Sequence, residues 1–368
     1  MRSLSTPART KVFLDCDPGR DDAVAILLAL HLPEIDLVGI SSVHGNSTID
    51  AMTYNAVRLL VSYGSAEQAT RIPVFKGSEF PLVAAPRTAS TIHGADGLGG
   101  VEGLLDMSNE RVAQQQSEAL KSNAIIGMAD ACKALAPGEK LTLVGVGAFT
   151  NIALFISVFP DLLLEKVSQI VLMGGAEGRG NKSPVSESNV YCDPHAASIV
   201  FDCPIPVVIC PLNLTHTAIF TDEIHSLLLQ PNPTAPFSPE APLPPAASDL
   251  RLSLSTNLTH FAAAYKRKYG FLGPPLHDPL TIAYIARPEL FKGTRYRVDV
   301  ELKGDHSVGA TVVDLWEYKK EQVDQDPSNW GRKGKNVLIL EEVDVPAFYK
   351  LFLEAVDAAD KVCPIGAR

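Results

Sequence analysis

Four aspartates are concentrated in the short stretch "LDCDPGRDD" near the start of the chain. Asp15 and Asp17 end an apolar run that is typical of a buried strand, and their spacing of two places both side chains on one face. A Pro-Gly turn follows, and Asp21 and Asp22 open a segment whose apolar residues have helical spacing. The dipole of a helix favours carboxylates at its N-terminus, which accounts for Asp21 or Asp22 but not for all four aspartates.

Carboxylates this close together repel one another, and an unpaired buried charge is costly. A hard divalent cation such as Ca²⁺ or Mg²⁺ removes the conflict, because these ions prefer clustered carboxylate oxygens. The stretch therefore predicts a metal site at a strand-to-helix turn.

Apolar runs rich in β-branched residues alternate with helical patterns along the chain. The predicted strands cover residues 11–17, 35–43, 72–77, 140–147, 167–175, 205–210, 295–302 and 336–340. The predicted helices cover residues 21–32, 49–63, 117–136, 194–201, 252–268, 278–285 and 345–361. This alternation predicts an α/β fold with a mostly parallel central sheet and helices on both faces. Ligands bind such sheets at the C-terminal ends of the strands.

The length of 368 residues allows one large domain or two ordinary ones. Residues 230–249 are rich in proline and cannot continue a helix or a central strand. They could be a domain linker. We interpret them as an insertion in a single domain over residues 1–368, because both sides contribute residues to one predicted site.

The formal net charge of −10 argues against general binding to nucleic acid or to an anionic membrane. No apolar stretch reaches the roughly 18 residues that a membrane span needs. The first residues are polar and no apolar segment of a secretory signal follows them, so we expect a cytoplasmic protein. Six scattered cysteines, most of them flanked by apolar residues, suit reduced and buried thiols.

The chain resembles the calcium-dependent nucleoside N-ribohydrolases, the inosine-uridine preferring nucleoside hydrolase family, along nearly its whole length. The resemblance starts with the motif "LDCDPGRDDAVAILLAL". It continues, in the order of the family, with "VHGN", "IHGADGL", "GAFTNIA", "VLMGG", "DPHAA", "PLNLTH" and "PPLHDP". Among the branches of the family the chain is most similar to the fungal uridine nucleosidases, because of "PLNLTH", "GPPLHDP" and "ADKVCPIG".

The resemblance implies an enzyme that hydrolyses ribonucleosides, above all uridine and other pyrimidine nucleosides, to ribose and free base. It implies that Ca²⁺ is bound by Asp17, Asp22, Asp278 and the backbone carbonyl of Val146. Asp17 would be the base that activates a calcium-bound water, and Asp15 would support the loop without binding the ion. His277 would act at the leaving base. A homodimer or homotetramer is also implied.

The resemblance further implies a set of substrate-binding residues. They are Asp21, Asn46, His93, Asn181, Glu187, Asn189, Tyr265 and Tyr269. Asn181 and Asn189 could instead be turn formers, and the two tyrosines could simply pack a helix end. Ser188 stands where the family usually has an aromatic residue. The smaller, polar serine would enlarge the pocket or admit water to it. His44, His195 and His216 are expected to be structural or to support residues that touch the ligand.

Three alternatives remain open at this point. One is a hydrolase of the same family that prefers purines or has no base preference. Another is a non-catalytic nucleoside-binding protein on the same fold. The last is a phosphohydrolase with an aspartate nucleophile, which also needs paired aspartates and a divalent cation.

Overall fold

The computed structural model describes residues 9–86, 96–233, 236–260 and 262–366. Its centre is an eight-stranded sheet in the order β3-β2-β1-β4-β5-β6-β10-β7. Neighbouring strands in it are parallel except β10 and β7, which are antiparallel. The strands are β1 Thr10–Cys16, β2 Ile35–Ser42, β3 Val74–Phe75, β4 Leu141–Gly145, β5 Val167–Met173, β6 Val207–Cys210, β7 Phe291–Tyr296 and β10 Val337–Val343. A separate two-stranded sheet consists of β8 Val298–Val300 and β9 Thr311–Val313.

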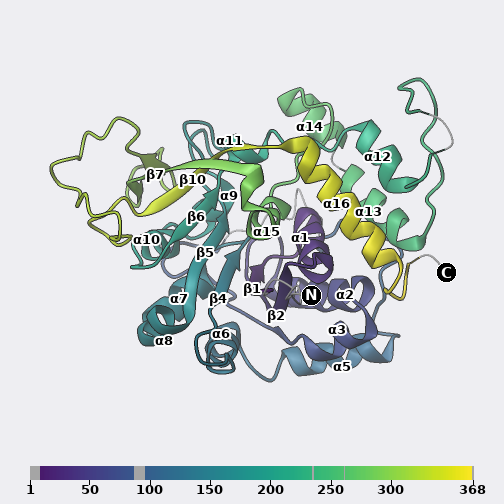
Figure 1. Ribbon diagram of the computed structural model, residues 1–368, viewed down its shortest axis with the longest axis horizontal. Helices are drawn as coiled ribbons and strands as arrows, with labels where there is room; N and C mark the ends of the chain where they lie inside the picture. The colour runs from purple at the N-terminus through teal and green to yellow at the C-terminus, as the bar shows by residue number, and fades with distance from the viewer. Residues whose placement is uncertain (1–8, 87–95, 234–235, 261, 367–368) are drawn as a thin grey trace, which may run out of the picture.

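Helices cover both faces of the sheet, as Figure 1 shows. One face packs against α1 Arg20–His31, α2 Ile49–Tyr63, α12 Asp222–Leu229, α13 Asp249–Thr259, α15 Pro279–Ala286 and α16 Val345–Asp360. The opposite face packs against α6 Ala124–Lys133, α7 Thr150–Val158, α8 Pro160–Lys166, α9 Ser188–Cys192 and α10 Pro194–Phe201. Shorter or peripheral helices are α3 Ala66–Arg71, α5 Glu110–Ala119, α11 Leu212–Thr215, α14 Ala262–Tyr269 and the 3₁₀ helix Pro288–Leu290.

The alternation of side chains along β1 decides which of the two apolar cores each residue joins. Val12, Leu14 and Cys16 belong to the core beneath α1, whereas Phe13 belongs to the core beneath α7. Asp15 therefore points toward the α7 side of the sheet. The predicted α/β fold with a mostly parallel sheet is confirmed.

The predicted helix over residues 117–136 is wrong. The structure has two helices there, α5 and α6, with Leu120–Asn123 between them. Asn123 caps α6, because its side-chain oxygen accepts a hydrogen bond from the backbone N–H of Ile126 at 3.0 Å. A short polar side chain that bonds nearby backbone favours a helix end over a helix interior.

Two other predicted elements are interrupted. The predicted strand over residues 295–302 divides at Arg297 into β7 of the main sheet and β8 of the small sheet. The predicted helix over residues 252–268 divides into α13 and α14. The small strand β9 was not predicted.

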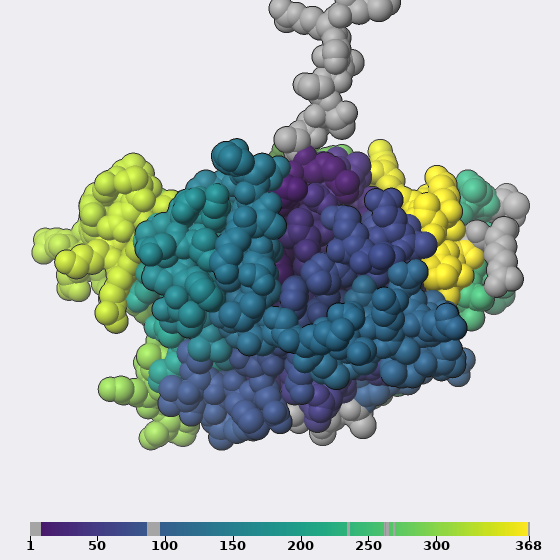
Figure 2. All heavy atoms as spheres, turned by 90° about the horizontal axis from the view of Figure 1, so that it is seen from below, coloured from purple at the N-terminus to yellow at the C-terminus, as the bar shows by residue number. Residues whose placement is uncertain are grey.

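Two irregular segments lie at the periphery. The described residues of the Pro-rich stretch 230–249 contain no helix or strand until α13 begins at Asp249. The segment between β9 and β10 stands at one edge of the molecule, where it is yellow-green in Figure 2. Within the described residues, no helix is long and apolar enough to cross a membrane.

Candidate active site

Carboxylates from distant parts of the sequence meet where α1 and α15 begin. Ligand oxygens of Asp21, Asp22 and Asp278 lie within 4.8 Å of one another. The Asp22 carboxylate also accepts hydrogen bonds from the backbone N–H groups of Gly19 at 2.9 Å and Asp17 at 3.2 Å, which fixes the turn after β1. Packing of α1 against α15 brings the three side chains together.

The Asp17 carboxylate is enclosed by backbone. A Cβ atom at Gly45 would lie 2.1 Å from Asp17 Oδ2, and one at Gly147 would lie 2.7 Å from Oδ1, so a larger residue at either place would displace the carboxylate. Asn46 holds Asp17 twice. Its backbone N–H donates to Oδ2 at 2.8 Å, and its side-chain amide donates to the Asp17 carbonyl at 2.9 Å.

The buried aspartates around the turn after β1 and the start of α15 resist ionisation. Burial raises the pKa values of Asp17, Asp22 and Asp278, and repulsion among the aspartates adds to the effect. The pKa of Asp22 reaches about 7. A buried set of oxygen donors with excess negative charge is the environment that Ca²⁺ or Mg²⁺ would neutralise.

Asp15 lies beside this cluster but is held separately. Its Oδ1 accepts hydrogen bonds from the Ser41 hydroxyl at 2.5 Å and the Asn151 amide at 2.8 Å. Its Oδ2 is buried and has no hydrogen-bond partner among the described residues. Burial raises the pKa of Asp15 to about 7.

Polar side chains of the segment after β5 face the ends of β4 and β5. The Asn189 amide donates to the carbonyls of Val146 at 2.9 Å and Met173 at 3.0 Å. Glu187 caps α9 and accepts a hydrogen bond from the backbone N–H of Gly175 at 3.1 Å, and burial raises its pKa to about 7. Asn181 Oδ1 is shielded from solvent and has no hydrogen-bond partner in the described part of the chain, so it is available to a ligand.

His277 connects the acidic cluster to a group of aromatic rings. Its Nδ1 lies 2.7 Å from the Thr215 hydroxyl, and its Nε2 lies 3.4 Å from the Tyr265 hydroxyl. Burial lowers the pKa of His277 to about 4, so its imidazole is neutral at neutral pH. The rings of His216 and His277 are 5.4 Å apart.

The aromatic rings form a compact group beside His277. Phe271 stacks on Tyr269 at 5.5 Å and on Tyr265 at 6.3 Å, and its ring lies 5.1 Å from His216. Tyr265 and Tyr269 are 5.6 Å apart, as their spacing of one helical turn predicts. Flat aromatic faces and hydroxyl groups suit a planar heterocycle.

Comparisons with known proteins decide the family. A profile described as inosine-uridine preferring nucleoside hydrolase matches residues 12–350. A pyrimidine-specific ribonucleoside hydrolase RihA from Shewanella woodyi is 34% identical over 94% of this chain and 97% of its own. This chain belongs to the inosine-uridine preferring nucleoside hydrolase family. A RihA from Escherichia coli O8 is 38% identical to this nucleoside hydrolase over 83% of this chain and 88% of its own.

A solved structure shows the same fold. The purine-preferring ribonucleoside hydrolase from Gardnerella vaginalis matches with a TM-score of 0.77 and 27% identity, over 95% of this chain and 99% of its own. The prediction of a nucleoside-hydrolysing enzyme is confirmed by these relatives.

The hydrolase brings most of the predicted site residues to one edge of its sheet. The turn after β1, the loop after β2 and the start of α15 carry the aspartates and Asn46, while the segment after β5 carries Asn181, Glu187 and Asn189. His93 lies outside the described residues. The sequence predicts a structural or supporting role for His216 and does not single out Thr215 or Phe271.

Backbone pairing explains why Thr215 and His216 meet His277. Leu276 N–H donates to the Ala218 carbonyl at 3.0 Å, and Phe220 N–H donates to the Pro274 carbonyl at 2.9 Å. The segment after α11 therefore lies antiparallel to the segment before α15. The motif "PLNLTH" was the available signal, since it carries both Thr215 and His216.

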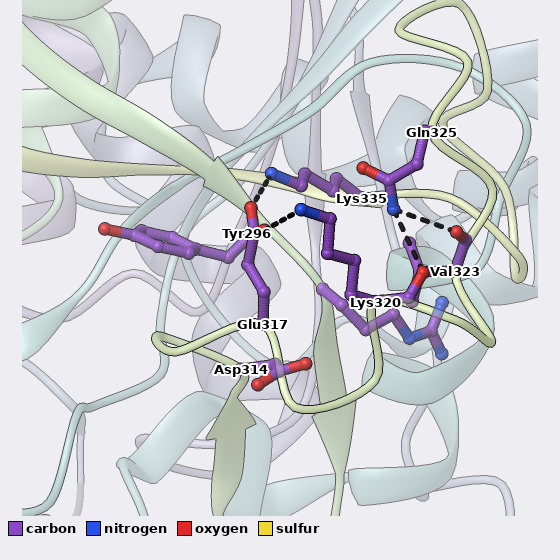
Figure 3. A pocket seen from close by; sticks show the side chains of 8 residues that line it. Tyr296, Asp314, Glu317, Lys320, Val323, Gln325 and Lys335 are labelled. Atoms are coloured by element: carbon purple, nitrogen blue, oxygen red, sulfur yellow. Dashed lines mark hydrogen bonds and ion pairs between the residues drawn. The ribbon is translucent and has the colours of Figure 1, made fainter.

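A pocket elsewhere in the hydrolase contains none of the predicted site residues. It lies between β7 and the segment that follows β9, and Figure 3 shows its lining. Two of its lysines share one carboxylate: Lys335 lies 2.5 Å from Glu317, and Lys320 lies 4.0 Å from the same side chain. Both ion pairs lie within the segment between β9 and β10.

Proposed function

We propose that this nucleoside hydrolase cleaves the N-glycosidic bond of uridine and other pyrimidine ribonucleosides, releasing ribose and free base. Its similarity to pyrimidine-specific RihA enzymes supports this base preference. The alternative, a preference for purines, has the support of one structural relative, the purine-preferring enzyme from Gardnerella vaginalis.

We further propose that the site binds Ca²⁺ through Asp17, Asp22, Asp278 and the Val146 carbonyl. The observation that carries this proposal is the burial of several carboxylates that raise one another's pKa values. A bound divalent cation supplies Lewis-acid chemistry, which acidifies water and orients hydroxyl groups.

Asp17 is the proposed base. Its carboxylate accepts a hydrogen bond from the backbone of Asn46 and lies against two glycines, which orients it toward the proposed calcium site. Positive charge develops on the sugar as the nucleobase leaves, and the carboxylate of Asp21, which is not a proposed calcium ligand, provides negative charge that stabilises it.

The remaining residues divide between sugar and base. Asp21, Asn46 and Glu187, together with Asn181 and Asn189, would hydrogen-bond the ribose hydroxyls, because amides and carboxylates supply the donors and acceptors that a sugar requires. The base would stack on the aromatic group and receive a hydrogen bond from neutral His277.

Tyr265 and Tyr269 belong to the same proposed base site, and so does His93. Ser188, in place of an aromatic residue, would leave room beside the sugar. We also propose a single domain with an insertion at residues 230–249, a homodimer or homotetramer, and a cytoplasmic location.

The test measures reducing-sugar release from uridine, cytidine, inosine and adenosine, with and without a calcium chelator. We expect the fastest release from uridine, loss of release with chelator, and little release from 2′-deoxyuridine. Asp17→Asn should abolish release, whereas the exposed carboxylate variant Asp130→Asn should not. A calcium-dependent rise in melting temperature without sugar release from any nucleoside would favour the binding-protein alternative.

A further inference from the structure

A buried chain of three side chains lies behind the active site on the α7 side of the sheet. His44 Nε2 lies 2.9 Å from the Thr150 hydroxyl oxygen, and that hydroxyl donates to Asp193 Oδ2 at 2.7 Å. His44 is 5% exposed, Thr150 1% and Asp193 0%. Buried polar groups of this kind are costly unless every member is paired, so the arrangement is well defined.

The chain connects three separate segments that carry active-site groups. His44 lies in the loop after β2, directly before the glycine and asparagine that enclose and hold Asp17. Thr150 begins α7, shortly after the Val146 carbonyl. Asp193 joins α9 to α10 and follows the helix that Glu187 caps.

The direction of each hydrogen bond between His44, Thr150 and Asp193 can be assigned. A hydroxyl group has one proton, and Thr150 gives it to the carboxylate of Asp193, which can only accept. The Thr150 oxygen must therefore accept a hydrogen bond from His44 Nε2. Burial lowers the pKa of His44, so the imidazole is neutral and carries its proton on Nε2.

Asp193 is fixed from other directions as well. Its Oδ1 accepts from the backbone N–H of Ala196 at 3.1 Å and so caps α10, while its Oδ2 also accepts from the N–H of Leu82 at 2.8 Å. Because backbone N–H groups hold both of its oxygens, Asp193 is the fixed end of this series of hydrogen bonds. The His44 backbone N–H donates to the Ser78 carbonyl at 3.1 Å, while the Thr150 hydroxyl holds the imidazole within the described part of the chain.

We propose that Thr150, anchored by Asp193, is a positioning residue that orients His44 and thereby keeps the Gly45–Asn46 loop in contact with Asp17. The inference rests on the proposed function, since Asp17 is the proposed base and calcium ligand. Thr150 does not touch the carboxylate itself and acts through the loop. Supporting residues of metal sites commonly change affinity or activity when they are mutated.

The test compares Thr150→Val, which keeps the shape and removes the hydroxyl, with Thr150→Ser, which keeps the hydroxyl. We expect Thr150→Val to lower kcat/KM by about 10- to 100-fold and to weaken calcium binding, measured as the calcium concentration needed to raise the melting temperature. Thr150→Ser should restore most of both. Thr142→Val is the matched control, because Thr142 is equally buried in β4 and its hydroxyl lies 3.3 Å from that of Ser168, away from the aspartates.

A spectroscopic measurement keeps the proposal testable if Thr150→Val does not fold. In the wild-type protein labelled with ¹⁵N-histidine, long-range ¹H–¹⁵N spectra should show His44 with its proton on Nε2. A proton on Nδ1 would overturn the proposal, as would wild-type kcat/KM and calcium response in Thr150→Val, or an equal loss in Thr142→Val. If the wild-type protein releases no sugar, the proposed function fails, and the calcium titration and the spectra still decide the role of Thr150.

Discussion

Replacement of Asp15 by asparagine should stabilise the metal-free protein at alkaline pH relative to acid pH. Burial raises the pKa of Asp15 from 3.8 to about 7. The folded state therefore holds this proton more tightly than the unfolded state. The cost of ionising Asp15 is absent below pH 4, grows as the pH rises, and is complete above pH 7. At about 1.4 kcal/mol for each pKa unit, the full cost is about 4 kcal/mol.

Asparagine cannot ionise, yet its side-chain oxygen can still accept the hydrogen bonds from Ser41 and Asn151. About 3 kcal/mol of the cost arises between pH 5 and pH 8. For a chain of this length, that free energy corresponds to about 3–4 °C in melting temperature. From pH 5 to pH 8, the melting temperature of Asp15→Asn should therefore rise by about 3–4 °C relative to that of the wild-type protein.

The assay is thermal unfolding of both proteins in a calcium chelator at pH 5 and pH 8, at equal ionic strength. The comparison at each pH cancels the titration of the other buried carboxylates. Asp130→Asn, an exposed carboxylate variant, is the control and should differ from the wild type equally at both pH values. If the melting temperature of Asp15→Asn also differed from that of the wild type by the same amount at both pH values, the reasoning would be refuted.

Three further outcomes are expected. Calcium at 100 times its Kd at pH 8 should stabilise the wild-type protein by about 2.7 kcal/mol. The same calcium concentration should stabilise it less at pH 5, because protons compete with calcium for Asp22. Equal shifts in melting temperature at both pH values would contradict Asp22 as a ligand. Arg251→Met should cost about 3–5 kcal/mol in urea unfolding with KM unchanged, because Arg251 forms a buried ion pair with Asp360 that joins α13 to α16; a loss below 1 kcal/mol would rule out a structural role. Tyr265→Phe should lower kcat for uridine by up to about 10-fold, the cost of one lost hydrogen bond, because its hydroxyl lies 3.4 Å from His277 Nε2. The exposed variant Tyr318→Phe is the control, and equal kcat values would remove Tyr265 from the site.

The parts of the fold that depend on local sequence could be predicted. Helix α2 occupies the predicted residues 49–63, with Thr48 as its cap. The turn after β1 follows from the short spacing between Asp17 and Asp22, because a strand, a tight turn and a helix are all encoded within it. The break at Asn123 was missed, although asparagine is a good helix cap and was the local signal for it.

Contacts between distant segments could not be predicted in the same way. Thr215 meets His277 across 62 residues of sequence, and His44 meets Thr150 across 106. No local pattern distinguishes these side chains from other buried threonines and histidines. Their pairing depends on the strand order and on the antiparallel contact between the segments before α15 and after α11, and both arise only in the folded chain.

The meeting of Asp22 with Asp278 has a consequence for synthesis of the protein. The ribosome adds about 5–20 residues per second, so the first aspartates wait roughly 10 to 50 s before Asp278 is made. During this interval the nascent chain has only part of the proposed set of calcium ligands. Tight retention of the ion would then begin only after α15 has packed against α1, and a luminescent lanthanide in place of calcium would report this step of folding.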